Sequence, residues 1–143
     1  MKRKSGLLLG LCVSTSLSLF SGLSLAEVAI VVHPSVTDTI NKEDLSRVFL
    51  GKAKSLDGGH KVTPLNLPEG NATREEFNDK VLGKNDSQLK SYWSKLIFTG
   101  KGQPPKEIGS DREVKQLIAA DSGLIGYIDA ASVDDSVKVL VKY

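Results

Sequence analysis

The sequence contains one cysteine, Cys12, and it lies in an apolar stretch close to the N-terminus. A chain with one cysteine cannot form a disulfide within itself, and a metal site built from several thiolates is excluded as well. The protein is therefore not a small domain held together by disulfides. Its fold must depend on an ordinary hydrophobic core.

The N-terminal segment has the pattern of an export signal. Basic residues at positions 2–4 precede the apolar stretch Leu7–Phe20, and Ser24-Leu25-Ala26 supplies small residues at the positions that a signal peptidase recognises. The apolar stretch is shorter than the roughly 20 residues that a membrane-spanning helix needs. We therefore predict that residues 1–26 are a secretory signal peptide, that the protein is periplasmic, and that it is not inserted in the membrane after cleavage.

The excess of basic charge belongs to that signal. The whole chain has 19 Lys and Arg against 17 Asp and Glu, and positions 2–4 hold three of the basic residues. Residues 27–143 therefore have 16 basic and 17 acidic residues, a formal net charge of −1. This balance gives no electrostatic reason to expect a nucleic-acid partner or an anionic membrane surface. The segment is long enough to bury a core as a single domain.

Signatures of catalysis and metal binding are missing too. The two histidines, His33 and His60, are far apart in the sequence and have no Asp, Glu or Cys at the spacing of metal ligands. No G-x-S-x-G motif marks a hydrolase nucleophile. We therefore expect no catalytic residue, no metal and no cofactor, and we predict that the protein is not an enzyme.

Strand and helix patterns alternate along residues 27–143. The run Val28–Val32 is continuously apolar and mostly β-branched, which is typical of a strand buried on both faces in a parallel sheet covered by helices. Further strands are expected at 61–67, 124–128 and 136–141. The pattern predicts a single layered α/β domain with a largely parallel sheet.

Four helices are expected between these strands. Asn41 caps the first, which has an apolar stripe and ends at Gly51. The second runs over 73–82. Asn85 or Asp86 caps the third, and Ser110 opens the fourth in a capping-box pattern with Glu113. The residues expected to face the core are Leu45, Val48, Phe49, Phe77, Val81, Leu82, Leu89, Trp93, Leu96, Ile97, Val114, Leu117 and Ile118.

The stretch Pro64–Phe77 is the most informative part of the chain. A strand that stops at Pro68 is followed by a short polar turn with Gly70 and Asn71, and then by a helix. The first turn of a helix leaves backbone N–H groups without intrahelical partners, and the helix dipole adds roughly half a positive charge there. This arrangement predicts a site for a small anion.

Four segments carry motifs, and the first two are Asp44–Lys52 and Gly70–Arg74. They resemble the "EL..IFLGK" and G-S-G-T-R segments of the phosphate-binding proteins of ABC-type phosphate transporters. Tyr92-Trp93 and Gly123–Tyr127 match their later "YW" and "GAIGY" stretches in the same order. The resemblance implies the type 2 periplasmic-binding-protein fold, with phosphate or a related oxyanion as ligand and a transporter or another envelope protein as partner.

The chain also departs from that family. Its members are usually about twice as long and have two lobes that close on the ligand, so this chain resembles a short single-lobe form. In the ligand turn, Asn71-Ala72-Thr73 replaces Ser-Gly-Thr, and Leu67 stands in place of the family's arginine. One lost hydrogen bond to a charged group weakens binding by roughly 10- to 100-fold, so we expect weak binding.

The candidate ligand-binding residues are Asn71, Ala72 and Thr73, with Arg74 and Ser35 as outer candidates. Each also has a structural interpretation. Asn71 or Thr73 could cap its own helix, Arg74 could pair with a nearby carboxylate, and Ser35 could belong to a plain loop. The alternative function is a protein-interaction or accessory module that kept the fold and lost the anion site.

Overall fold

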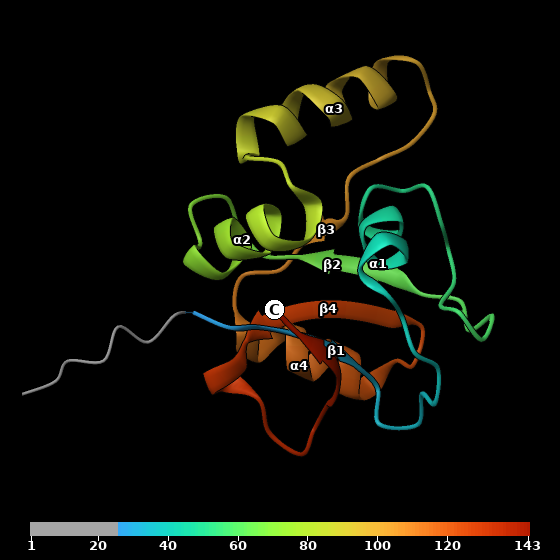
Figure 1. Cartoon of the computed structure of the whole chain (residues 1–143), viewed down its shortest axis with the longest axis vertical. Helices are drawn as coiled ribbons and strands as arrows, with labels where there is room; N and C mark the ends of the chain where they lie inside the picture. Colours follow the sequence, from blue (N-terminus) through green and yellow to red (C-terminus); the bar gives the residue numbers. More distant parts are fainter. Residues whose placement is uncertain (1–25) are drawn as a thin grey trace, which may run out of the picture.

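The computed structural model describes residues 26–143, and Figure 1 shows their arrangement. The predicted signal peptide lies outside the described residues, except for Ala26. The first element is strand β1 (Val28–Val32), in which all five side chains are buried as expected. Within residues 26–143, no helix has the length and apolar character needed to cross a membrane.

Five strands form one sheet in the order β3-β2-β4-β1-β5. The other four strands are β2 (Thr63–Asn66), β3 (Lys106–Glu107), β4 (Leu124–Asp129) and β5 (Lys138–Lys142). β2 is parallel to β3 and β4, whereas β1 is antiparallel to both of its neighbours, β4 and β5. Four strands thus share one direction and β1 alone runs against them. The α/β class is confirmed, but the orientation of β1 differs from the expected parallel pairing.

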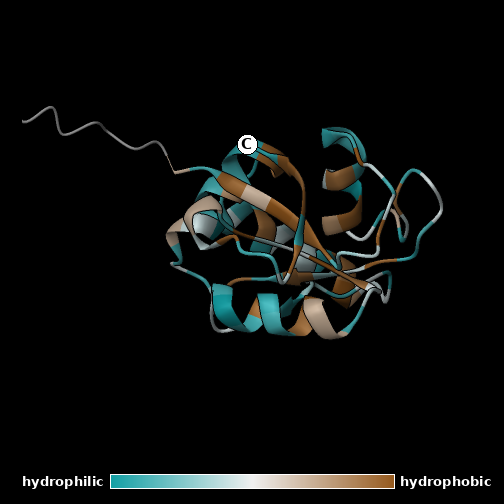
Figure 2. Ribbon diagram, turned by 90° about the horizontal axis from the view of Figure 1, so that it is seen from below, coloured by the Kyte–Doolittle hydropathy of each residue, from teal (hydrophilic) through white to brown (hydrophobic). Residues whose placement is uncertain are grey.

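Helices cover both faces of the sheet, and neighbouring residues of β4 show which helix lies where. Side chains of a strand alternate between the two faces. The Tyr127 ring packs against Phe49 of α1 (Lys42–Phe49) and Phe77 of α2 (Ala72–Phe77). The residue before it, Gly126, faces α4 (Asp111–Ala120) instead, and α4 packs on the opposite face of the sheet. Figure 2 shows the hydrophobic residues concentrated along the strands between these layers.

Several expected boundaries shift. The second strand spans Thr63–Asn66 rather than 61–67, and the second helix starts at Ala72 and continues after Phe77 as a π-helix, η1 (Asn78–Leu82). The short strand β3 and the 3-10 turn η2 (Ala130–Ser132) were not expected. Helix α3 (Asp86–Phe98) follows Asn85, which forms a full capping box with Gln88.

Helix α4 differs from its prediction in two details. Ser110 caps it by accepting a hydrogen bond from the Glu113 N–H at 3.2 Å. The Glu113 carboxylate, however, accepts from the Gly109 N–H rather than from that of Ser110, so the reciprocal bond of a capping box is missing. Leu117, expected in the core, is 38% exposed, because only Val114 and Ile118 face the sheet.

Helix α3 projects from the rest of the domain (Figure 1). Leu89 is buried and Trp93 is half-buried, but Ile97 is 54% exposed and Phe98 is 92% exposed. The inward position expected for Ile97 is therefore wrong. α3 is held to the end of α1 by the Tyr92 hydroxyl, which donates to the Leu50 carbonyl at 2.6 Å.

Candidate functional site

The turn between β2 and α2 has the predicted form. Gly70 adopts a φ of 80°, in the left-handed region that favours glycine, and the Asn71 N–H donates to the Pro68 carbonyl at 3.2 Å. Helix α2 then begins at Ala72 with Asn71 as its N-cap. Strand β2 thus leads through this turn directly to the N-terminus of α2.

Asn71 has a structural role in this turn. Its side-chain oxygen accepts a hydrogen bond from the Arg74 N–H at 3.2 Å, which is the usual N-cap arrangement. Among the hydrogen bonds of residues 26–143, none uses the N–H of Ala72 or Thr73, or the Thr73 hydroxyl. Three donors thus remain at the start of α2 that a small anion could take.

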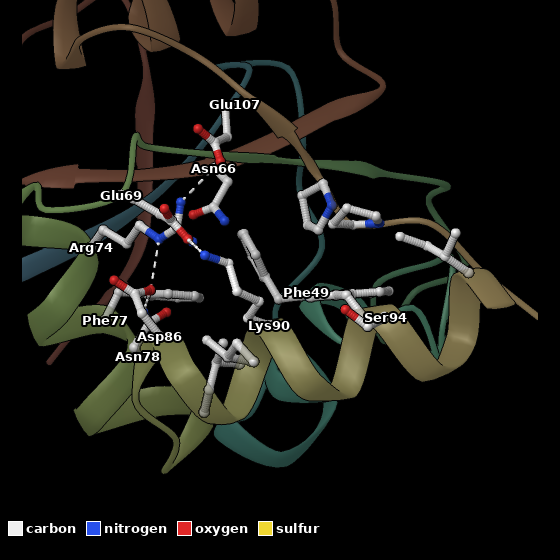
Figure 3. A pocket seen from close by; sticks show the side chains of 16 residues that line it. Phe49, Asn66, Glu69, Arg74, Phe77, Asn78, Asp86, Lys90, Ser94 and Glu107 are labelled. Atoms are coloured by element: carbon white, nitrogen blue, oxygen red, sulfur yellow. Dashed lines mark hydrogen bonds and ion pairs between the residues drawn. The ribbon is translucent and has the colours of Figure 1, made fainter.

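Arg74 makes contacts inside the domain. The residue is 7% exposed. Its Nε donates to Asp86 Oδ1 at 3.1 Å, and its Nη1 donates to Glu107 Oε2 at 3.2 Å (Figure 3). The same Nη1 donates to the Leu67 carbonyl at 2.8 Å. Two carboxylates therefore face one guanidinium, and its positive charge is largely cancelled within the protein. Of the two roles expected for Arg74, the observed contacts are those of a residue that pairs with nearby carboxylates.

Leu67 sits at the position where the resemblance expects an arginine, and its side chain is fully buried. Its N–H donates to the Tyr127 hydroxyl at 3.2 Å, and that hydroxyl in turn donates to the side-chain oxygen of Asn66. Burial raises the pKa of Tyr127 above its ordinary value, so the phenol stays neutral and can act as a donor. The Leu67 side chain gives the site no charge.

A cavity of about 320 Å³ lies beside this turn, beneath α3. Arg74 and Lys90 are its basic lining residues, and Glu69, Asp86 and Glu107 are its acidic ones. Lys90 reaches Glu69 at 3.5 Å, and Asn78 donates to Asp86 at 2.8 Å. With three carboxylates against two cations, the cavity itself repels an anion, so an oxyanion is better placed at the helix start than in the cavity.

Ser35 is not brought to this turn. It follows β1, and the register pairs Val32 with Ile125, whereas Pro64 at the start of β2 also pairs with Ile125. Because β1 and β2 flank β4 and run in opposite directions, β1 ends at the edge of the sheet where β2 begins, opposite the edge where β2 leads to Asn71. Ser35 instead forms a hydrogen bond with the neighbouring His33 Nδ1 at 2.7 Å.

The other histidine also has a partner within the domain, since His60 Nε2 lies 2.6 Å from the Ser122 carbonyl. Throughout residues 26–143, no three His, Cys, Asp or Glu side chains come together as possible metal ligands. Sequence reasoning missed Asp86 and Glu107 as partners of Arg74. The sequence indicates Asp86 only as a possible helix cap, and β3, which carries Glu107, has no strand pattern in the sequence.

Comparison with known proteins finds similar structures but no similar sequences. No family model matches the sequence, and no curated protein is significantly similar to it. Solved structures do match. The ABC-type phosphate transport receptor from Vibrio cholerae has a TM-score of 0.62 at 20% identity, over 80% of this chain and 45% of that protein.

Two further structures give the same result. A protein described as a phosphate ABC transporter substrate-binding protein with bound phosphate, from Clostridium perfringens, has a TM-score of 0.62 at 18% identity, covering 80% of this chain and 44% of its own. PstS from Borrelia burgdorferi has a TM-score of 0.59 at 15% identity, over 80% of this chain and 46% of its own. The chain thus spans less than half the length of these proteins, and over that part it has the fold of the phosphate-binding proteins of ABC transporters.

Proposed function

We propose that this protein is an exported, periplasmic solute-binding protein that takes phosphate or a related oxyanion at the start of α2. The observation that carries the proposal is the free N–H pair of Ala72 and Thr73. These groups stand in the turn where the resemblance places the ligand of phosphate-binding proteins. The fold shared with a phosphate-bound protein supports the proposal.

The mechanism is binding without chemistry on the ligand. The two N–H groups and the Thr73 hydroxyl donate to the oxyanion, and the dipole at the start of α2 adds attraction. Arg74 is a weaker contributor because Asp86 and Glu107 already neutralise it, although no hydrogen bond within residues 26–143 uses its Nη2. Asn71 shapes the turn by capping the helix.

The expected affinity is low. Hydrogen bonds to a charged group contribute about 1.5–3 kcal/mol each, and association itself costs about 4–15 kcal/mol. Three such bonds contribute about 4.5–9 kcal/mol, which exceeds only the lower part of that cost, so we expect a dissociation constant on the order of 1 mM or higher. A second copy, a transporter subunit or another envelope protein would supply the opposing donors in the cell.

A protein-interaction or accessory role is the second candidate, and a specific observation favours it. The cavity beside the turn is lined by three carboxylates and two cations, and the exposed Ile97 and Phe98 on α3 offer apolar contacts to a partner. In that case the helix start would be only a structural turn. The two candidates differ in whether the isolated protein binds an oxyanion.

A titration followed by amide NMR separates them. Phosphate, sulfate and chloride are added at matched ionic strength to the protein without its signal segment. Saturable shifts of the Ala72 and Thr73 amides with phosphate or sulfate, absent with chloride, would support oxyanion binding. Thr73→Ala should weaken binding by about tenfold through the lost hydroxyl. If phosphate and chloride produce the same small shifts at tens of millimolar, the oxyanion proposal is wrong and the second candidate is favoured.

A further inference from the structure

A second and larger hollow lies at the other end of β2. Its volume is about 780 Å³, and it opens between the end of α1, the start of β2 and the segment that returns from α3. Its lining is mainly apolar, with Val48, Phe49, Val62, Trp93, Pro104 and Leu124 among the residues that form it. Small-molecule sites usually occupy about 300–1,000 Å³ and have such a lining. The size and the apolar lining fit a small organic molecule.

The edge of this hollow is basic. Lys54, Lys61 and Lys106 line it and are exposed, and Asp121 is its one acidic lining residue. No ion pair among residues 26–143 involves any of the three lysines. Asp121 is already occupied, because its Oδ1 accepts the Gly123 N–H at 2.7 Å. The hollow therefore combines an apolar interior with an unneutralised positive rim.

The two hollows beneath α3 have opposite character. Phe49, Trp93, Pro104 and Pro105 line both, so these side chains lie between them. The smaller one beside Arg74 has an excess of carboxylates, whereas the larger one has an excess of lysines. An anionic group is thus favoured on the larger hollow's side and repelled on the other.

We propose that the larger hollow binds an amphipathic anion, a small molecule with an apolar body and one carboxylate, sulfonate or phosphate group. The apolar body lies against Trp93, Pro104 and Leu124, which keep solvent-accessible apolar surface that the contact removes from water. The anionic group stays at the rim, within reach of the ammonium groups of Lys54, Lys61 and Lys106. This site does not use the turn at Asn71.

Trp93 provides a direct reporter, because it is the only tryptophan in the chain and it lines the hollow. The probes are decanoate, decyltrimethylammonium and inorganic phosphate, each kept below the concentration at which micelles form. Decanoate should change the Trp93 emission saturably, and the other two should not. Equal responses to decanoate and to the cation would overturn the proposal, as would an equal response to inorganic phosphate.

Charge variants test the role of the rim. Replacing Lys54, Lys61 and Lys106 together by glutamine should weaken decanoate binding about tenfold or more. The matched control replaces Lys84, Lys95 and Lys142, which lie outside the lining, by glutamine. This control should leave the affinity for decanoate unchanged. Thermal unfolding by circular dichroism checks that both variants are folded. Equal weakening in the two triple variants would contradict the proposal, since it would show a general effect of net charge.

Discussion

Arg74 Nε lies 3.1 Å from Asp86 Oδ1, and this ion pair joins the start of α2 to the start of α3. The same guanidinium reaches Glu107 on β3 through Nη1 at 3.2 Å. An arginine that the resemblance places in the ligand turn therefore fastens three elements together. Because Arg74 is buried and paired with two carboxylates, its main role is structural, and any contact with a ligand is secondary.

The first prediction concerns this ion pair. Arg74→Ala should lower the free energy of unfolding by about 2–4 kcal/mol, because it removes the cation that pairs with two carboxylates and the donor of the buried Leu67 carbonyl. Chemical denaturation measures the change. Arg47→Ala is the control. Arg47 contacts Asp44 at 3.5 Å with both side chains exposed, so its loss should cost about 0–1 kcal/mol. Equal losses in the two variants would contradict a buried role for Arg74.

The second prediction concerns the attachment of α3. Tyr92→Phe removes the 2.6 Å hydrogen bond to the Leu50 carbonyl and should lower stability by about 0.5–1.5 kcal/mol. Amides of α3 should also exchange with deuterium faster, since this bond ties the helix to α1. In the control Tyr143→Phe the lost hydroxyl has no hydrogen bond within residues 26–143, and α3 exchange should not change. Unchanged exchange in Tyr92→Phe would disprove the attachment.

The third prediction concerns Gly126, which belongs to the segment that resembles "GAIGY". A Cβ at this position would lie 2.9 Å from Val114 Cγ1, closer than real Cβ contacts, and 3.1 Å from Ile118 Cδ1, which is tighter than most. Gly126→Ala should therefore destabilise the protein by about 1–3 kcal/mol, measured by thermal or chemical unfolding. Gly102→Ala meets its nearest side-chain atoms at 3.8 Å and should be nearly neutral. A neutral Gly126→Ala would show that α4 does not pack tightly on β4.

The fourth prediction concerns acid. Hydrogen bonds from Lys115 and Ser136 lower the pKa of Asp134 from 3.8 to about 2. Because the folded-state pKa is lowered, the ionised carboxylate adds stability above the unfolded pKa of 3.8, and this contribution is lost as the pH falls towards 2. The wild type should be more stable than Asp134→Asn at neutral pH, and the two should converge in acid. A constant difference between the wild type and Asp134→Asn across this pH range would contradict the shift.

Local signals predicted the elements well. The unbroken β-branched run of β1 gave a fully buried strand, and Asn41, Asn71 and Asn85 each cap the helix that follows them. These features depend on residues close together in the chain, so a sequence pattern is enough to find them. The orientation of β1 is set by pairing with β4 and β5, which begin more than ninety residues later.

The candidate site was predicted only in part. The turn, its glycine and its cap follow from nearby residues, but the partners of Arg74 lie 12 and 33 positions further on. Glu107 stands in a two-residue strand that has no periodicity to reveal it. The exposed end of α3 was missed for a related reason. Its apolar spacing predicts a helix, yet that spacing does not show that Ile97 lies beyond the edge of the domain.

The binding of phosphate at the start of α2 can be tested by removing a single donor. Ala72 is the first residue of α2, where proline is tolerated because its missing N–H has no intrahelical partner. Asn71 has φ −73° and ψ 128°, an extended conformation that suits a residue before proline. Ala72→Pro should therefore keep the fold while removing one donor. Lys42→Pro makes the matching change at the first residue of α1, behind the cap Asn41.

The decisive measurement is the phosphate affinity of these two variants and the wild type, taken from the shifts of the Thr73 amide. The account predicts about tenfold weaker binding in Ala72→Pro, unchanged binding in Lys42→Pro and similar melting temperatures for all three proteins. Equal phosphate affinity in Ala72→Pro and the wild type would contradict an oxyanion site at the start of α2.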